Sequence, residues 1–472
     1  MRFSKCFSLF WHFSIALVCF FESEFLMNSW FFFDAFFAAG GEGILQPLLI
    51  QLVVIILAAR AGAFIARKLR QPSVVGEIVA GLLLGPSCFA AVFPDLFGLV
   101  FQPLEGADSV KLEAALTTLS QIGLIFLLFL IGLEFDFSHI RYQGRAAAAI
   151  SITGVVAPFI IGFTLATLML PRLALLDPLA SFHARSFAIF MGTAMSITAI
   201  PILGRILIEL GMQRTPIGTT VIASAACDDA VGWILLAAVS SLAIGNFQVW
   251  NVITMAGSSI FFLLVLLYTV RPFLLPWLEK EVIRGHGRLL PGPLAILLAL
   301  LFVCAITTSA IGIFAIFGAF LFGAVLSGKS SLREAISGQL NDFVTIFFLP
   351  IFFTYTGLRT NIGTLTTPES WFWCALVMAA AVLGKWGGCG LAARLSGMPR
   401  KEAACVGILM NTRALMELIV INVGMDLGVI PPSVYCMLVL MAVGTTLMAT
   451  PLAVRMLRNT PYEKGLIERG FL

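Results

Sequence analysis

Long apolar runs recur along nearly the whole of this 472-residue chain, and they limit its fold more than any other feature. Hydrophobic residues make up 60% of the sequence. Charged residues make up 11%, against about 25% in a typical soluble domain. Because a soluble fold cannot bury that much apolar surface, the sequence predicts an all-α membrane protein that crosses the bilayer many times.

Apolar runs of about 17–25 residues have the length of a transmembrane helix. Placing one helix on each run predicts about thirteen transmembrane helices in a single membrane domain over residues 44–456. The predicted spans lie near residues 44–66, 74–93, 114–133, 146–170, 186–208, 217–241, 249–275, 292–309, 312–328, 341–357, 371–393, 402–424 and 432–456.

The two ends of the chain fall outside this domain. Residues 1–43 begin with basic residues and continue into an apolar run, which indicates a signal peptide, an uncleaved anchor or a start placed too early, with Met27 as the alternative start. Residues 457–472 are predicted to be a short cytoplasmic tail.

Lysine and arginine are shared unequally between the two sets of connecting loops. Twenty lie on one side of the predicted spans, and four lie on the other. Because basic loops stay in the cytoplasm, the side with twenty is assigned to it, together with the C-terminus. The predicted location is the cell (inner) membrane. The four basic residues on the opposite side are Lys111, Arg172, Arg185 and Arg359.

The two halves of the chain are weakly similar. The similar segments are 76–85 with 318–326, 129–135 with 352–358, and 205–212 with 394–398. An odd number of spans separates the equivalent segments, so the halves would have opposite topology. Inverted repeats of this kind are typical of secondary transporters that rock around a site at the membrane midplane.

Charged residues inside the predicted spans are candidates for function, because a charge at mid-bilayer costs roughly 2.5–3.5 kcal/mol. Asp228 and Asp229 lie next to each other near the middle of their span, and adjacent helical side chains point about 100° apart. The two carboxylates can therefore face a fixed cation and a transported one. Lys385 is the natural partner of either aspartate. Such a pair is a proton-coupled switch, or alternatively a structural salt bridge between packed helices.

Polar residues interrupt two further spans and predict two discontinuous helices. In the first, Pro201 follows Ser196 and Thr198, and proline removes a backbone donor. In the second, Asn411 and Thr412 interrupt an apolar run. In transporters, broken helices bring half-helix dipoles to a midplane ion site. Hydroxyl and carbonyl oxygens suit a small hard cation, so these residues are possible ligands. The alternative is a kinked or locally polar helix without a ligand role.

Arg413 and Glu417 lie four residues apart in the second interrupted span, a spacing that favours a structural ion pair that shapes the site. The scattered cysteines and histidines fit no metal site, so no resident metal or cofactor is expected. The net charge of +4 is too small to indicate binding to nucleic acid. No catalytic motif indicates an enzyme.

Six motifs occur in order along the chain: VVGEIVAGLLLGPS, LLFLIGLEFD, SITAIPILGRILIELGM, the adjacent aspartates of AACDDAVGWILLA, the lysine within a span, and MNTRALMELIVINVGMDLGVI. Together they resemble the second monovalent cation:proton antiporter family, which comprises bacterial sodium/proton antiporters, Kef-type potassium efflux systems and plant cation/proton exchangers. The resemblance covers roughly residues 45–456. It implies a homodimer whose protomers each contain a dimerisation domain and a mobile core with two crossed broken helices.

The resemblance also implies residue roles. Asp229 would bind the cation and the proton, and Asp228 would pair with Lys385. Two adjacent aspartates are typical of electrogenic sodium exchangers, whereas Kef-type members more often carry Gln-Asp and electroneutral exchangers Asn-Asp. We therefore expect electrogenic exchange of Na+ for H+ by alternating access. Antiport of K+ is the nearest alternative, Li+ is another candidate cargo, and a passive cation channel or membrane sensor is more distant.

Overall fold

A computed structural model describes residues 44–468 apart from short gaps, and the predicted leader, residues 1–43, lies outside the described residues. Within some helices the backbone is described but individual side chains are not, and Asp229 is one of these. The gaps are residues 70, 104–106, 135–143, 177–183, 199, 213–214, 244–248, 313, 328–329 and 414.

Helices form all the regular structure of the described residues. The uninterrupted helices are α3 (Leu45–Lys68), α4 (Ser73–Leu83), α5 (Phe89–Val92), α6 (Pro94–Phe101), α7 (Ala107–Glu134), α9 (Gly144–Leu176), α12 (Pro216–Ala243), α15 (Pro291–Ile311), α16 (Ala315–Leu326), α23 (Pro432–Met456) and α24 (Glu463–Glu468). Three long helices each contain a π-helical turn: α13 (Val249–Val265), η1 (Leu266–Val270) and α14 (Arg271–Arg284); α17 (Ser330–Phe343), η2 (Val344–Phe348) and α18 (Leu349–Arg359); and α19 (Pro368–Val382), η4 (Leu383–Gly387) and α20 (Gly388–Leu395).

Two apolar spans are broken near their centres, as the sequence predicts. The first consists of α10 (Ala184–Ser196) and α11 (Ile200–Leu210), and the second of α21 (Arg400–Met410) and α22 (Leu415–Asp426). Pro201 lies in the first turn of α11, where the missing amide costs no helical hydrogen bond, so it begins the second half-helix.

Each of the thirteen predicted spans falls on an apolar helix or on a broken helix in the described part of the chain. Eight helices there are long and apolar enough to cross a membrane, and three more are apolar but shorter. The two broken helices account for the remaining two spans. The chain is therefore a polytopic all-α membrane protein.

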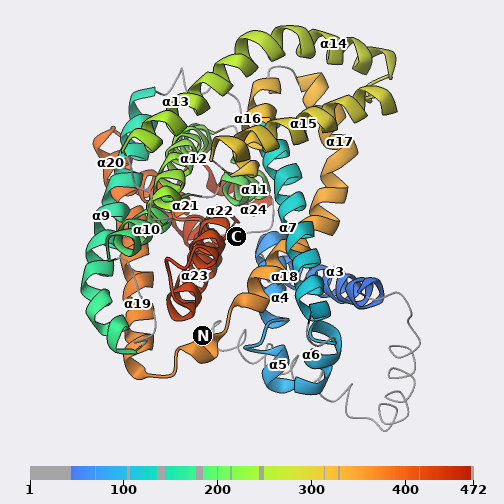
Figure 1. The fold of residues 1–472 in the computed structure, drawn as a ribbon. Helices are drawn as coiled ribbons and strands as arrows, with labels where there is room; N and C mark the ends of the chain where they lie inside the picture. The colour runs from blue at the N-terminus through green and yellow to red at the C-terminus, as the bar shows by residue number, and fades with distance from the viewer. Residues whose placement is uncertain are drawn as a thin grey trace.

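The helices form two bundles, which Figure 1 shows side by side. We call α3, α4, α7, α15, α16 and α18 the first bundle, and α9–α12 with α19–α23 the second bundle. Helix backbones meet in the first bundle. A Cβ added at Gly357 would collide with the carbonyl of Gly81, and one added at Gly81 would collide with the carbonyl of Phe353. Gly132 and Gly323 lie at a similarly close approach of α7 and α16. Small residues permit such contacts between membrane helices.

Helix contacts in one half of the chain have counterparts in the other. The contact of α3 with α4 corresponds to that of α15 with α16, and the contact of α9 with α10 corresponds to that of α20 with α21. The first two sequence similarities fall on helices that this correspondence makes equivalent, α4 with α16 and α7 with α18. The third pairs α11 with α20, which are not equivalent, so that similarity is not part of the repeat.

Candidate functional site

The interruptions of the two broken helices lie against each other. Thr198 Oγ1 in the first break is 3.4 Å from the carbonyl oxygen of Met410, the last residue of α21. Arg413 Nη1 in the second break donates a 3.3 Å hydrogen bond to the carbonyl of Ala194 in the last turn of α10. The guanidinium therefore lies at the negative end of the α10 dipole.

A buried ion pair lies beside this contact. Lys385 Nζ is 2.7 Å from Asp228 Oδ2 and donates a second hydrogen bond, 2.6 Å long, to Thr198 Oγ1. The Thr198 hydroxyl in turn donates to Asp228 Oδ2 at 2.8 Å. All three side chains are fully buried. The structure thus joins the predicted lysine, one of the two predicted aspartates and the first break in one charged cluster.

Lys385 occupies the centre of the π-helical turn η4. A π-turn adds one residue to the helix and rotates the following residues relative to the preceding ones, and such turns are frequent at functional sites. Glycines flank the lysine, and Gly384 packs against Pro158 of α9. Sequence reasoning did not identify this turn, and the only sequence signal for it is the glycines around Lys385.

Gly154 of α9 is a second residue that sequence reasoning missed. A Cβ there would lie 3.5 Å from Asp228 Oδ2, 3.7 Å from Lys385 Nζ and 2.7 Å from the sulfur of Cys389. The absence of a side chain at Gly154 therefore lets the backbone of α9 cover the ion pair. Nothing in the local sequence distinguishes this glycine from others in apolar spans.

Two buried oxygen atoms near the breaks have no hydrogen-bond partner within the described residues. They are Asp228 Oδ1 and Asn411 Oδ1. A buried acceptor without a donor is costly, and such groups are usually satisfied by water or an ion. Carboxylate and amide oxygens are suitable ligands for a small hard cation.

The other predicted hydroxyl ligands bond to nearby carbonyls. Ser196 Oγ donates to the carbonyl of Gly192 at 2.6 Å, and Thr412 Oγ1 donates to that of Leu409 at 2.8 Å. Both are buried at the ends of half-helices. Of the predicted hydroxyls, Thr198 is the one whose described hydrogen bonds reach the Asp228–Lys385 pair.

Asp229 follows Asp228 in α12, but its side chain lies outside what the structure describes. Arg413 and Glu417 form a buried ion pair with a separation of 3.3 Å. Because Arg413 also bonds to α10, this pair links the two broken helices.

A helical membrane protein with repeated halves, two broken helices in contact and a buried lysine–aspartate pair has the architecture of a secondary transporter. Residues 52–458 match the family described as "Sodium/hydrogen exchanger, transmembrane", and the chain belongs to this family.

Individual relatives agree with this assignment. The chain is 38% identical over 417 residues to the Na(+)/H(+) antiporter NhaS4 of Synechocystis sp., an alignment that covers 86% of this chain and 96% of the relative. It is 30% identical to K(+)/H(+) antiporter 1 of Saccharomyces cerevisiae over 86% of this chain, but spans about half, 46%, of that protein.

The fold is also similar to a solved structure, that of the sodium proton antiporter MjNhaP1 from Methanocaldococcus jannaschii at pH 8. The TM-score is 0.58 at 16% sequence identity, and the match covers 88% of this chain and 100% of the other. At this identity the similarity concerns the fold alone.

Proposed function

We propose that this chain is an electrogenic antiporter that exchanges a monovalent cation, Na+, for protons by alternating access. The observation that carries the proposal is the fully buried cluster of Thr198, Asp228 and Lys385 at the contact of two broken helices. Burying these charges costs free energy, because each buried charge must be paired or neutralised. A membrane protein that keeps such a cluster is therefore expected to use it in transport.

In the proposed cycle, protons and the cation compete for the adjacent aspartates. Lys385 balances the charge of Asp228 when no cation is bound. A cation that binds at Asp229, with Asp228 Oδ1 available as a further oxygen ligand, weakens the hold of Asp228 on the lysine. Lys385 then releases its proton, and the proton returns when the cation leaves. The second bundle moves relative to the first only with a cation or with protons bound, because unoccupied carboxylates would be costly to carry through the apolar surroundings.

The choice of Na+ rests on the adjacent aspartates and on NhaS4, whose name specifies Na(+)/H(+) exchange. The second candidate is K+/H+ antiport, which the name of the yeast relative supports. Both ions are hard cations that prefer oxygen ligands. We further propose a homodimer in the cell (inner) membrane, surrounded by lipid, with the C-terminal tail in the cytoplasm as the distribution of basic residues indicates.

The test uses acidified everted membrane vesicles and a pH-sensitive dye. Na+, Li+ or K+ is added to vesicles that contain the wild-type chain, Asp229→Asn, Lys385→Ala or the control Asp108→Asn. Asp108 is an exposed acid paired with Lys111, so its substitution changes one acid to an amide far from the cluster.

We expect dye dequenching on addition of Na+ with the wild type and the control, and its loss in Asp229→Asn. A valinomycin-clamped membrane potential should alter the rate, since electrogenic exchange moves net charge. A response to K+ alone would replace Na+ by K+ as the cargo. A fast conductance without proton movement, or no response with the protein present in the membrane, would refute the antiporter proposal.

A further inference from the structure

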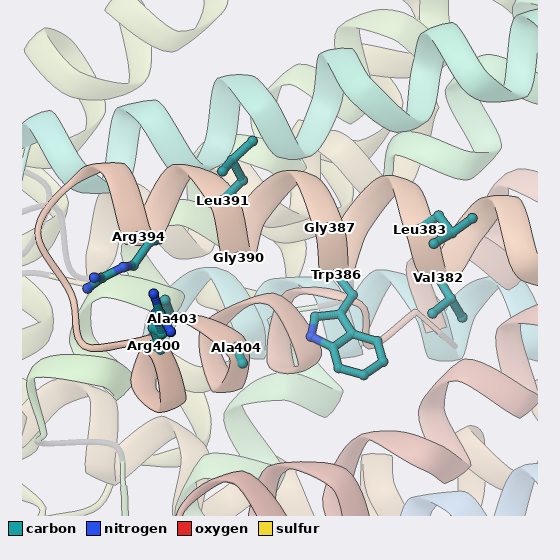
Figure 2. A pocket seen from close by; sticks show the side chains of 10 residues that line it. All are labelled: Val382, Leu383, Trp386, Gly387, Gly390, Leu391, Arg394, Arg400, Ala403 and Ala404. Carbon is teal, nitrogen blue, oxygen red and sulfur yellow. The ribbon is translucent and has the colours of Figure 1, made fainter.

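A groove lies on the outer side of the second bundle, between η4–α20 and α21, with a volume of about 310 Å³ (Figure 2). This volume is at the lower end of the range for small-molecule sites, roughly 300–1,000 Å³. It lies outside the Asp228–Lys385 cluster and contains none of its residues. The groove is lined by Val382, Leu383, Trp386, Gly387, Gly390, Leu391, Arg394, Arg400, Ala403 and Ala404.

The groove is apolar along most of its length and basic at one end. Figure 2 shows Val382 and Leu383 at one end and both arginines, Arg394 and Arg400, at the other. Leu383 and Leu391 on its rim are 68% and 60% exposed. Exposed leucines on a membrane-spanning helix face lipid rather than water, so the groove opens toward the hydrocarbon of the bilayer.

Most N–H donors of Arg394 and Arg400 have no hydrogen-bond partner among the described residues. Arg394 uses one described hydrogen bond, 2.8 Å from Nη1 to the carbonyl of Met398. Arg400 has no ion-pair partner among the described residues. Glu402 is the acidic residue in the first turn of α21, and the adjacent Lys401 donates to the carbonyl of Arg458. This end of the groove therefore carries more positive than negative charge, and guanidinium groups bind phosphate in a bidentate manner.

We propose that this groove binds an anionic phospholipid, with its phosphate at Arg394 and Arg400 and one acyl chain along the apolar floor. The charge pattern matches such a lipid from end to end: a basic site at the membrane surface continues into an apolar channel open to the bilayer. Basic pockets between transmembrane helices on the cytoplasmic side are suited to anionic headgroups, and this end lies among the loops with the excess of basic residues.

The groove shares its walls with the ion-pair cluster. Its upper wall is η4, which presents Trp386 to the groove and Lys385 to Asp228. Its lower wall is α21, the first half of a broken helix, and a Cβ at Gly407 would collide with the carbonyl of Trp386. A bound lipid therefore rests on both elements that position the cluster, and it would travel with the second bundle.

The experiment is native mass spectrometry of the full-length protein in detergent, titrated with phosphatidylglycerol, with phosphatidylcholine of the same chains, or with inorganic phosphate. The test variant is Arg394→Gln/Arg400→Gln. The matched control is Lys280→Gln/Arg288→Gln, which removes two exposed charges from the same side of the chain but outside the groove. A third variant, Gly387→Leu, fills the groove, because a Cβ at Gly387 meets nothing within 4 Å.

We expect phosphatidylglycerol to bind in preference to phosphatidylcholine, and its affinity to fall about thirtyfold in the arginine variant, at about 1 kcal/mol for each charge. Gly387→Leu should also weaken binding, and the control should not. Equal loss in the control pair, equal binding of both lipids, or binding of inorganic phosphate as tightly as the lipid would each refute the lipid site. The first of these would indicate general surface charge, and the last a site for a free anion only. If the arginine variant is not monodisperse, Gly387→Leu decides the question.

Discussion

The α-carbon of Gly154 faces Cys389 so closely that a Cβ would lie 2.7 Å from the cysteine sulfur. Cys389 is fully buried one turn after Lys385, and its thiol lies 3.7 Å from the carbonyl of Ile150. Helix α9, which covers the ion pair, can therefore lie this close to Cys389 only because residue 154 has no methyl group.

Gly154→Ala should impair transport, because the added methyl must displace either α9 or the segment that carries Lys385. Overpacking of this kind costs typically 1–3 kcal/mol. Proton–cation exchange in vesicles and the apparent melting temperature in detergent measure the effect.

The second substitution Cys389→Ala should restore activity in Gly154→Ala by making room for the methyl group. Gly257→Ala is the matched control, because a Cβ there meets nothing within 4 Å. Full activity of Gly154→Ala alone would show that the close approach of α9 is not needed.

The Asp228–Lys385 pair should behave as a unit in folding. Lys385→Ala or Asp228→Asn alone leaves a buried group without its partner, and breaking a buried ion pair costs about 3–5 kcal/mol. The double variant should be more stable than the sum of the two single losses indicates. Thermal unfolding in detergent provides this double-mutant cycle, and strict additivity would mean that the 2.7 Å contact contributes nothing specific.

Arg359 links the two bundles from the end of α18. It donates to Asp426 of α22 at 2.6 Å and to Asn422 at 3.2 Å. If the bundles move against each other, a cross-link at this position must stop transport. Cysteines at positions 359 and 426, joined by a short bifunctional thiol reagent, should abolish exchange.

The two single-cysteine variants treated with the same reagent control for the native cysteines. A reagent cleaved by reductant should allow transport to recover. Undiminished exchange in a fully cross-linked sample would exclude relative motion at this end of the interface.

Protons should act as competitive inhibitors of the cation. In the proposed cycle protons and Na+ compete for the same site, so lowering the pH should raise the apparent KM for Na+ while the maximal rate is unchanged. Initial rates of dye dequenching across a series of pH values measure both constants. A maximal rate that falls at constant KM would instead place the proton at a site that the cation does not share.

The positions of the spans could be predicted from the sequence because the length of the apolar runs determines them. The breaks could be predicted because Pro201 follows two hydroxyl residues in one apolar run, and because Asn411 and Thr412 interrupt another. Residue type alone did not distinguish Asp228 from Asp229 as the partner of Lys385. The resemblance to known antiporters indicated Asp228, and the structure places its Oδ2 2.7 Å from Lys385 Nζ. The π-turn η4 and the role of Gly154 could not be predicted, because both depend on how distant helices pack.

The glycine contacts of the first bundle have a mechanical consequence. Where Gly81 meets Gly357 and Gly132 meets Gly323, backbone touches backbone, and no flexible side chain lies between to absorb a displacement. The first bundle should therefore behave as a stiff frame. Any large change of shape must then occur at its boundary with the second bundle, where contacts such as that of Arg359 with Asp426 can break and re-form without unfolding either part.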